Sequence, residues 1–173
     1  MAQDFFILEQ ELETFAAMLP DISSPVLDAG CATGRDSTVL ALKGLQVVGV
    51  DISAEAIQQA KQSNPAMDFL QMDVRHLEFG SETFGGVWCN ATLAYLDDQG
   101  LRIALQEIYR VLKPGGVLAV SLKEGPGKSM LEVQALLQQY HFGLRQSYLL
   151  NEQKRFGPGR PDTNWIYCFA VKA

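Results

Sequence analysis

The stretch that decides the fold is Val26-Leu27-Asp28-Ala29-Gly30-Cys31-Ala32-Thr33-Gly34-Arg35-Asp36. A short apolar run ends in an acid, and a glycine-rich turn follows before a helical pattern begins near Gly34. The glycines allow a tight turn that can approach a ligand closely, and the first turn of the helix offers unpaired N–H groups. This segment therefore predicts a strand, a binding turn and a helix in direct succession.

The same alternation continues along the chain. Apolar runs rich in β-branched residues are separated by helical patterns, which predicts an α/β fold with a parallel sheet and helices on both faces. The predicted strands are Pro25–Asp28, Gln46–Val50, Met67–Gln71, Gly86–Cys89, Gly116–Leu122 and Leu144–Leu149. The predicted helices are Gly34–Lys43, Ala54–Ser63, Gln99–Leu112 and Ser129–Tyr140, after an amphipathic first helix over about residues 3–19.

The end of the chain breaks this rhythm. The last apolar run, Trp165–Lys172, follows the sixth strand after an irregular segment, Asn151–Asn164, with no helical pattern between them. The last strand should therefore run antiparallel, as a hairpin partner of the sixth. The sequence shows no linker or repeat, so residues 1–173 are interpreted as a single domain.

Composition excludes several classes of function. The chain has 14 Lys and Arg against 20 Asp and Glu, a net charge of −6 that argues against nucleic acid as a partner. No apolar run approaches the roughly 20 residues that span a bilayer, and the N-terminus lacks the pattern of a signal peptide, so the expected location is the cytoplasm without membrane contact. The three cysteines lack zinc spacings and are expected to be buried, so no metal is predicted.

Acids follow three successive strands. In an open α/β sheet, ligands bind outside the carboxyl ends of the strands, where Asp28, Asp51 and Asp73 all lie. Asp28, before the glycine-rich turn, suits an ammonium group, and Asp51 can accept both hydroxyls of a ribose. Asp73 can accept a hydrogen bond from an exocyclic amine while Met72 packs on the base. Taken singly, Asp51 could cap the next helix, for which Ser53 is better suited, and Asp73 could be a solvated turn residue.

An ammonium group, a ribose and an adenine in this order are the parts of S-adenosylmethionine, which is therefore the expected cofactor. A nicotinamide cofactor fits less well, because the dinucleotide fingerprint requires a glycine where Arg35 stands.

Six stretches carry a resemblance to a known family. They are VLDAGCATGRDS, VVGVDIS, QMDV, FGGVWCNATLAYL, EIYRVLKPGGVLAVSLKEG and GRPDTNWIYCFAVK. In this order and spacing the chain resembles a small class I S-adenosylmethionine-dependent methyltransferase of the type-11 or type-25 domain kind, from about Leu8 to the C-terminus. The resemblance implies a Rossmann-like seven-stranded sheet of order 3-2-1-4-5-7-6, with strand 7 antiparallel.

The resemblance also implies which residues hold the cofactor. They are Asp28, Gly30, Ala32, Gly34, Asp51, Ile52, Met72, Asp73, Val74 and Asn90. Ala32 stands where the family has its middle glycine, so a modest loss of cofactor affinity is expected. Asn90, after the fourth strand, would face the methionine and the transferred methyl, and the product would be S-adenosylhomocysteine.

Residues for the acceptor are less well defined by sequence. Tyr95 stands where relatives often have His, and it is either a substrate contact that aligns the acceptor together with Asn90 or an aromatic lid without a chemical role. Arg155 and Arg160 lie in the loop before the last strand and would meet an anionic acceptor, unless the loop is simply a solvated basic segment. Glu124, after the fifth strand, is a further candidate for substrate contact.

The expected reaction is in-line methyl transfer to a small-molecule acceptor, in which the enzyme aligns nucleophile and methyl. A catalytically silent S-adenosylmethionine-binding subunit or sensor is the alternative, and the same cofactor could also assist decarboxylation or cyclisation. Relatives carry a longer N-terminal segment with a Tyr that closes over the cofactor, whereas about twenty residues precede Pro20 here. Three alternatives follow: the site is open, it is completed by a second copy or a partner subunit, or the sequence comes from a truncated reading frame.

Overall fold

The computed structural model of the chain describes residues 8–173, so residues 3–7 of the predicted first helix lie outside the described part. Helix α1, Glu9–Met18, buries Leu12 and Phe15 at helical spacing against the sheet. It ends where expected, because Leu19 is extended in front of Pro20.

The alternation of strands and helices predicted from the sequence is confirmed. The strands are β1 (Val26–Ala29), β2 (Val47–Asp51), β3 (Asp68–Gln71), β4 (Phe84–Cys89), β5 (Leu112–Lys123), β6 (Phe142–Asn151) and β7 (Asn164–Lys172). The helices after α1 are α2 (Arg35–Leu42), α3 (Ala54–Ser63), η1 (Thr92–Tyr95, a 3-10 turn), α4 (Asp98–Val111), α5 (Met130–Gln139) and α6 (Glu152–Phe156).

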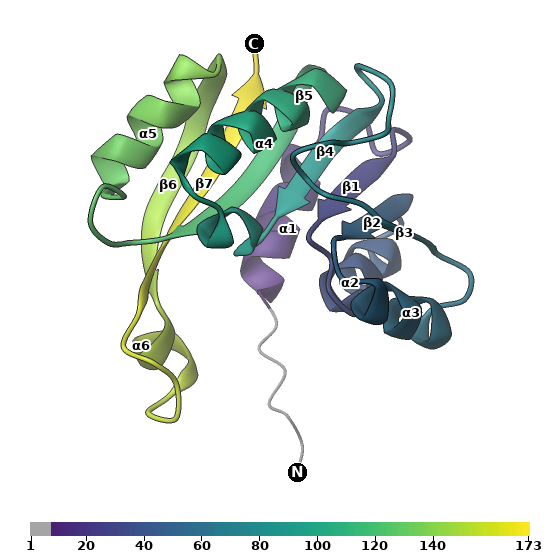
Figure 1. Cartoon of the computed structure of the whole chain (residues 1–173), viewed down its shortest axis with the longest axis horizontal. Coiled ribbons are helices and arrows are strands. Elements are labelled where there is room, and N and C mark those ends of the chain that lie inside the picture. The colour runs from purple at the N-terminus through teal and green to yellow at the C-terminus, as the bar shows by residue number, and fades with distance from the viewer. Residues whose placement is uncertain (1–7) are drawn as a thin grey trace.

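The sheet has the order β3-β2-β1-β4-β5-β7-β6, as the resemblance implied. Strands β1 to β5 pair in parallel, whereas β7 pairs antiparallel with both β5 and β6. The carboxyl ends of the parallel strands therefore share one edge, the lower edge in Figure 1. The expected antiparallel hairpin at the end of the chain is present.

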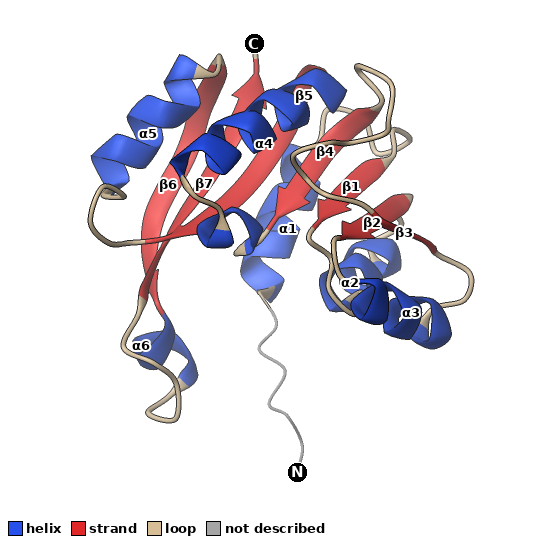
Figure 2. Cartoon of the chain, in the orientation of Figure 1, coloured by secondary structure: helices blue, strands red, loops and turns tan. Residues whose placement is uncertain are grey.

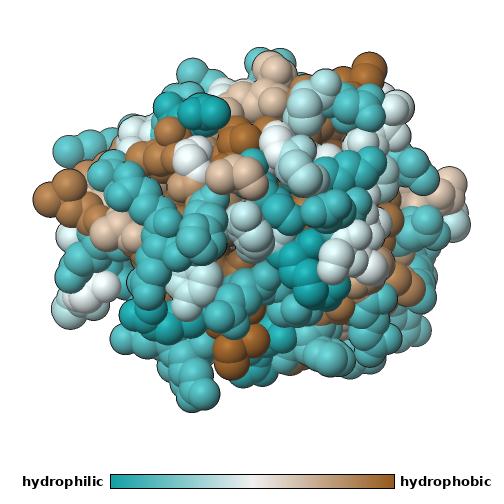
Figure 3. All heavy atoms as spheres, turned by 90° about the horizontal axis from the view of Figure 1, so that it is seen from above, coloured by the Kyte–Doolittle hydropathy of each residue, from teal (hydrophilic) through white to brown (hydrophobic). Residues whose placement is uncertain are grey.

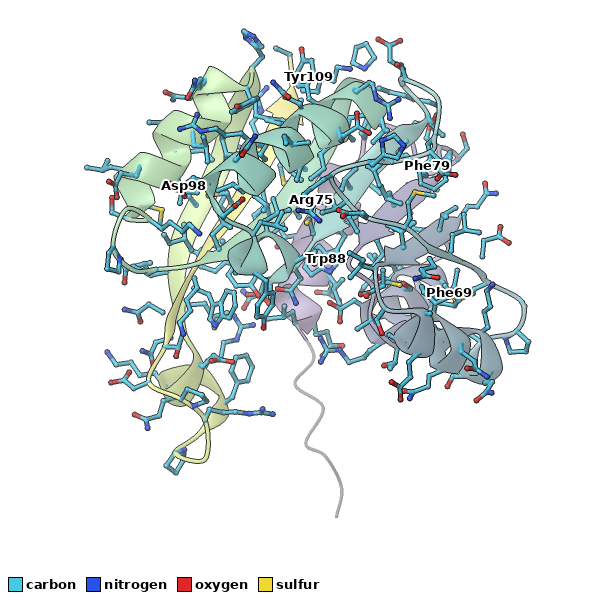
Figure 4. All side chains as sticks on the ribbon, in the orientation of Figure 1. Phe69, Arg75, Phe79, Trp88, Asp98 and Tyr109 are labelled. Atoms are coloured by element: carbon cyan, nitrogen blue, oxygen red, sulfur yellow. The ribbon has the colours of Figure 1, made fainter. Side chains whose placement is uncertain are left out.

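Helices cover both faces of the sheet (Figure 2). One hydrophobic cluster joins α4 and α5 to the sheet and includes Leu105, Ile108 and Leu137. A second joins α1 and α2 to the opposite face, and within it Phe15 lies 5.6 Å from the ring of Trp88, which is labelled in Figure 4. The two central strands β1 and β4 are buried along their whole length, which explains why they read as continuous apolar runs.

Local sequence explains where several helices begin. Ser53, Asp97 and Ser129 each accept a backbone N–H of the first turn of α3, α4 and α5, respectively. At α5 the Glu132 carboxylate accepts from the backbone N–H of Ser129, which completes a capping box. The interpretation of Asp51 as the cap of α3 is therefore wrong, since Ser53 fills that position.

Two short elements were not predicted. The segment expected to be irregular, Asn151–Asn164, contains α6, whose N-cap is the Asn151 side chain. The η1 turn, Thr92–Tyr95, occupies the loop after β4. Both elements extend from the carboxyl edge of the sheet, where ligands of such folds bind.

The cysteine prediction is confirmed, because Cys31, Cys89 and Cys168 are buried and unpaired. Among residues 8–173, no His, Cys, Asp and Glu side chains form a group of three that could hold a metal ion. No helix in that range is long and apolar enough to cross a membrane. On the face seen from above, hydrophilic residues predominate and hydrophobic ones are scattered (Figure 3).

Candidate active site

A cleft with two adjoining compartments opens at the carboxyl edge of the sheet. The outer compartment, about 430 Å³, is lined by Gly30, Ala32, Asp51, Ile52, Met72, Asp73, Val74, Arg75, Asn90, Ala91, Thr92, Tyr95 and Leu96. The inner compartment, about 260 Å³, is lined by Asp28, Gly30, Cys31, Ala32, Thr33, Arg35, Asp36, Asn90 and Ala91. Ligand pockets typically have volumes of this order.

All the residues expected to bind the cofactor except Gly34 line one of these compartments. Gly34 has a left-handed backbone with φ 83° and is the N-cap of α2. A side-chain carbon there would lie 2.7 Å from the ring of Phe69. Gly34 therefore starts α2 and lets the helix pack closely on β3, whereas its contact with a cofactor stays a prediction.

The turn after β1 needs glycine for two separate reasons. Gly30 has φ 84°, and a side-chain carbon on it would lie 1.9 Å from Oγ1 of Thr92. That hydroxyl donates to the backbone oxygen of Ala29 at 2.9 Å, so it holds η1 against the turn. Ala32 also lies in the left-handed region, with φ 47°, and it lines both compartments.

The substitution Gly30→Ala is expected to lower the free energy of unfolding by about 1–3 kcal/mol more than Gly44→Ala, because the added methyl overpacks the turn. Gly44 is the matched control, since it has φ 87° with no atom within 4 Å of the added carbon. Its cost is the left-handed strain alone, about 1 kcal/mol. Urea unfolding of both variants measures the difference, and equal midpoints would show that η1 moves aside at no cost.

Asp51 is fixed at the end of β2 by two backbone groups. Its Oδ2 accepts from the N–H of Ala32 and its Oδ1 from the N–H of Ser53, both at 2.9 Å. Each carboxylate oxygen has a further lone pair with which to accept a hydroxyl. The carboxylate therefore joins the glycine-rich turn to β2 and stands at the outer compartment, ready for a vicinal diol.

Asp73, after β3, is paired with a neighbour that sequence reasoning did not consider. The Arg75 guanidinium donates to both carboxylate oxygens at 2.6–3.0 Å, and the backbone N–H of Arg75 donates at 2.8 Å. These contacts hold the pKa of Asp73 below its usual range, the side-chain bond from Arg75 being the largest cause. Arg75 itself lines the outer compartment and is labelled in Figure 4.

The inner compartment contains a pair of buried acids. Asp28 is 2% exposed and accepts a hydrogen bond from the Ser37 hydroxyl. Burial raises the pKa of Asp28 to about 7, and the nearby negative charge of Asp36 adds to the increase. Asp36 is 8% exposed and accepts from the indole N–H of Trp88 at 3.0 Å.

Asn90 is held rigidly where the two compartments meet. Its Oδ1 accepts from the hydroxyls of Ser121 and Tyr167, both at 2.8 Å, and its Nδ2 lies 3.4 Å from Oδ2 of Asp36. Burial, as the largest cause, raises the pKa of Tyr167 well above its usual range, so this hydroxyl remains a donor. The Asn90 amide is thus oriented by β5, β7 and α2 together.

The candidates for acceptor contact are dispersed. Tyr95 lines the outer compartment and is 84% exposed, at the mouth of the cleft. Glu124 accepts from the Asn164 side chain at 2.9 Å. This contact lies where the α6 segment, residues 151–164, joins β7, and Glu124 lines neither compartment.

Arg155 is bound to Glu11 of α1, whose side chain is only 1% exposed. Arg160 lies in the turn between α6 and β7, where its backbone N–H donates to Gly157. Neither arginine lines the cleft.

Several residues of the site were missed. Asp36 and Trp88 meet across 52 positions of sequence, and Tyr167 reaches Asn90 across 77, so only the folded sheet brings them together. Arg75 had a local signal, because an acid and an arginine two residues apart at a strand end can pair within one turn.

Comparison with known proteins agrees with this geometry. A family described as a methyltransferase domain matches residues 26–116. Malonyl-[acyl-carrier protein] O-methyltransferase of Salmonella typhimurium is 39% identical over 94 residues, which are 54% of this chain and 37% of that protein. Trans-aconitate 2-methyltransferase of an Azoarcus species is 35% identical over 104 residues, 59% of this chain and 40% of that protein. The chain therefore matches well under half of the length of these relatives.

Solved structures share the fold over nearly the whole chain. The 1,6-didemethyltoxoflavin-N1-methyltransferase of Burkholderia thailandensis, solved with S-adenosylhomocysteine bound, has a TM-score of 0.79 at 23% identity and covers 95% of this chain and 77% of its own. The [4+2]-cyclase SpnF has a TM-score of 0.77 at 19% identity, over 95% of this chain and 80% of its own. At these identities the likeness shows the fold alone, whereas the family match covers more than half of the sequence. The chain belongs to the methyltransferase domain family.

Proposed function

We propose that this protein is an S-adenosylmethionine-dependent methyltransferase that acts on a small-molecule acceptor. The observation that carries the proposal is the row of polar groups along the two compartments: Asp28 and Asn90 inside, Asp51 at the turn and Asp73 outside. A zwitterionic amino acid, a ribose and an adenine require these groups in that order. The compartments are also large enough for such a ligand.

The residues present fit this cofactor. Asp51 would accept the ribose hydroxyls, since both of its oxygens are already oriented by backbone N–H groups. Ile52, which is 63% exposed, and Met72 would enclose the adenine, with Asp73 and Val74 at its polar edge. Asp28, Gly30 and Ala32 would line the methionine part.

S-adenosylmethionine, when bound, supplies an electrophilic methyl group on a sulfonium. The contribution of the chain is alignment, because displacement at that carbon needs an in-line nucleophile and the exclusion of water. Asn90 is suited to this task, since three hydrogen bonds fix its amide where the compartments meet. Tyr95, exposed at the mouth, would contact the acceptor.

The names of the relatives support an acceptor that carries a carboxyl group. One is named for malonyl-[acyl-carrier protein] and another for trans-aconitate, and both names include a carboxylic acid group. Residues 151–164 also contain Lys154 and Arg160, which would attract such an acceptor towards the carboxyl edge of the sheet, whereas the charge of Arg155 is compensated by Glu11. A screen of small carboxylic acids is therefore the first search for an acceptor. Methyl transfer to any of them would exclude a silent binding subunit.

The substitution Asp51→Ala is expected to weaken the binding of S-adenosylhomocysteine ten- to hundredfold. It removes charge-assisted hydrogen bonds that contribute about 1.5–3 kcal/mol, and about 1.4 kcal/mol corresponds to a factor of ten. Calorimetric titration of the wild type and the variant measures the effect. NAD is the control ligand, and Asp68→Ala, an exposed acid on β3 outside the cleft, is the control variant. Equal affinity for NAD, or no effect of Asp51→Ala, would contradict the proposal.

A further inference from the structure

The inner compartment carries charges of both signs. Asp28 and Asp36 provide two carboxyl groups, and Arg35 is the only Lys or Arg among the described residues that line it. An amino acid at neutral pH has one ammonium and one carboxylate. The electrostatic pattern of the compartment is therefore complementary to a complete amino-acid zwitterion, and not only to an ammonium group.

Arg35 is placed at this compartment by the backbone. It is the first residue of α2, directly after the left-handed Gly34, and its side chain is 34% exposed. Its Nε and its Nη2 each lie 2.8 Å from Oδ1 of Asp36. A guanidinium has five N–H donors in a planar fork, so this contact leaves the Nη1 side able to bind a planar anion.

Asp36 holds the Arg35 guanidinium, and both of its carboxylate oxygens already face donors of the protein, so Asp36 does not bind a ligand directly. Its Oδ1 faces Arg35, and its Oδ2 accepts from Trp88 Nε1 at 3.0 Å and lies 3.4 Å from Asn90 Nδ2. With 8% exposure the carboxylate is almost enclosed by these donors. Asp36 therefore acts through its neighbours, and it links Arg35 to the Asn90 amide.

We infer that Arg35 binds the carboxylate of the amino-acid end of the cofactor, and that Asp36 is the positioning residue that orients it. Asp28 then faces the ammonium from the other side of the compartment. This assignment deepens the proposed function and depends on it. It also gives a role to the arginine that interrupts the dinucleotide fingerprint.

The test compares two ligands that differ by one group. S-adenosylhomocysteine carries the carboxylate, whereas its decarboxylated analogue, S-adenosyl-3-thiopropylamine, has the same adenosine, sulfur and ammonium without it. In the wild type, calorimetry should show ten- to hundredfold tighter binding of S-adenosylhomocysteine. Arg35→Gln should abolish this preference by weakening S-adenosylhomocysteine alone, and leave the affinity for the analogue unchanged.

Three further variants separate positioning from general damage. Asp36→Asn should reduce the preference partly, because the guanidinium loses its anchor while the other ligand contacts remain. Asp51→Ala should weaken both ligands by the same factor and so leave their ratio unchanged. Arg75→Gln, the matched arginine of the outer compartment, should also leave the ratio unchanged, and thermal melting of each variant checks that it is folded.

Each other outcome has one meaning. Equal weakening of both ligands in Arg35→Gln would assign Arg35 a structural role and overturn the inference, while the proposed function would stand. Equal affinity of the wild type for the two ligands would do the same. If the wild type binds neither ligand, the proposed function itself fails, and the assignment of Arg35 fails with it.

Discussion

The substitution Arg155→Ala is expected to lower the free energy of unfolding by about 3 kcal/mol, although Arg155 lies on a five-residue helix outside the hydrophobic core. Its guanidinium donates to both oxygens of Glu11, whose side chain is 1% exposed on α1. Truncation leaves this carboxylate buried with the Tyr148 hydroxyl, at 2.8 Å, as its remaining side-chain donor within residues 8–173. The lower end of the usual range applies because the Arg155 side chain is 29% exposed.

The matched control is the adjacent residue. Lys154→Ala changes an exposed cation of the same helix and should alter stability by no more than about 0.5 kcal/mol. The double variant Glu11→Gln/Arg155→Ala should recover part of the loss, because no uncompensated charge remains buried. Urea unfolding measures all of these differences. A loss in Arg155→Ala no larger than in Lys154→Ala would show that the ion pair contributes nothing.

This ion pair changes the interpretation of the basic loop. The sequence shows cations near the end of the chain and predicts contact with an anionic acceptor, but it cannot show that one of them is held by an acid 144 residues earlier. In the structure, Glu11 joins α1 to the α6 segment, and Tyr148 stacks on Tyr167 at 5.8 Å beside them. Because Tyr167 also holds Asn90, the contact between α1 and α6 continues to the centre of the cleft.

The sheet could be predicted from the sequence because its signals are local. The acids at the ends of the first three strands, the glycine-rich turn and the caps at Ser53 and Ser129 are each encoded within a few residues. Strand order followed from the family resemblance and is confirmed by the pairing. The ends of the elements were predicted less well: β1 is displaced by one residue from the predicted Pro25–Asp28, and β5 begins at Leu112, four residues before the predicted Gly116.

The parts that could not be predicted depend on tertiary contacts. Asp36 receives its partners from β4, and Asn90 receives hydroxyls from β5 and β7, none of which follow from spacing. The α6 helix has five residues, too few for a periodic pattern to be recognised. Gly34 matched the motif, but its close approach to the ring of Phe69 becomes visible only in the structure.

The similarity in fold to a cyclase shows why the reaction has to be inferred from the residues of the site and not from the fold. SpnF shares this fold at a TM-score of 0.77, so the fold alone does not distinguish methyl transfer from other chemistry. The family match and the polar groups of the cleft favour methyl transfer.

Asp28 is expected to make the folded protein less stable as pH rises from about 4 to about 7. The pKa of this buried acid is raised to about 7 in the folded state, whereas an unfolded aspartate titrates near its ordinary value of 3.8. Between these values the folded state holds a proton that the unfolded state has lost, so deprotonation progressively favours unfolding. At about 1.4 kcal/mol per pH unit, the cost approaches roughly 4 kcal/mol at neutral pH.

Two variants test this assignment. Asp28→Asn has no charge to bury, so its urea midpoint should equal that of the wild type at or below about pH 4 and increasingly exceed it up to pH 8. Ser37→Ala removes the hydroxyl that lowers the pKa of Asp28, so the pH-dependent loss of stability should extend to higher pH. Parallel stability profiles of the wild type and Asp28→Asn from pH 5 to 8 would contradict the raised pKa.

The same group should make cofactor affinity depend on pH in the opposite sense. An ammonium binds the ionised carboxylate, so the dissociation constant of S-adenosylhomocysteine should fall as pH rises from 6 to 8 and then level off above the pKa of Asp28. In Asp28→Asn the affinity should be weaker and independent of pH over this range. The variant would then be more stable than the wild type at pH 8 and yet bind the cofactor less well, which is the pattern expected when a buried charge is kept for binding at the expense of stability.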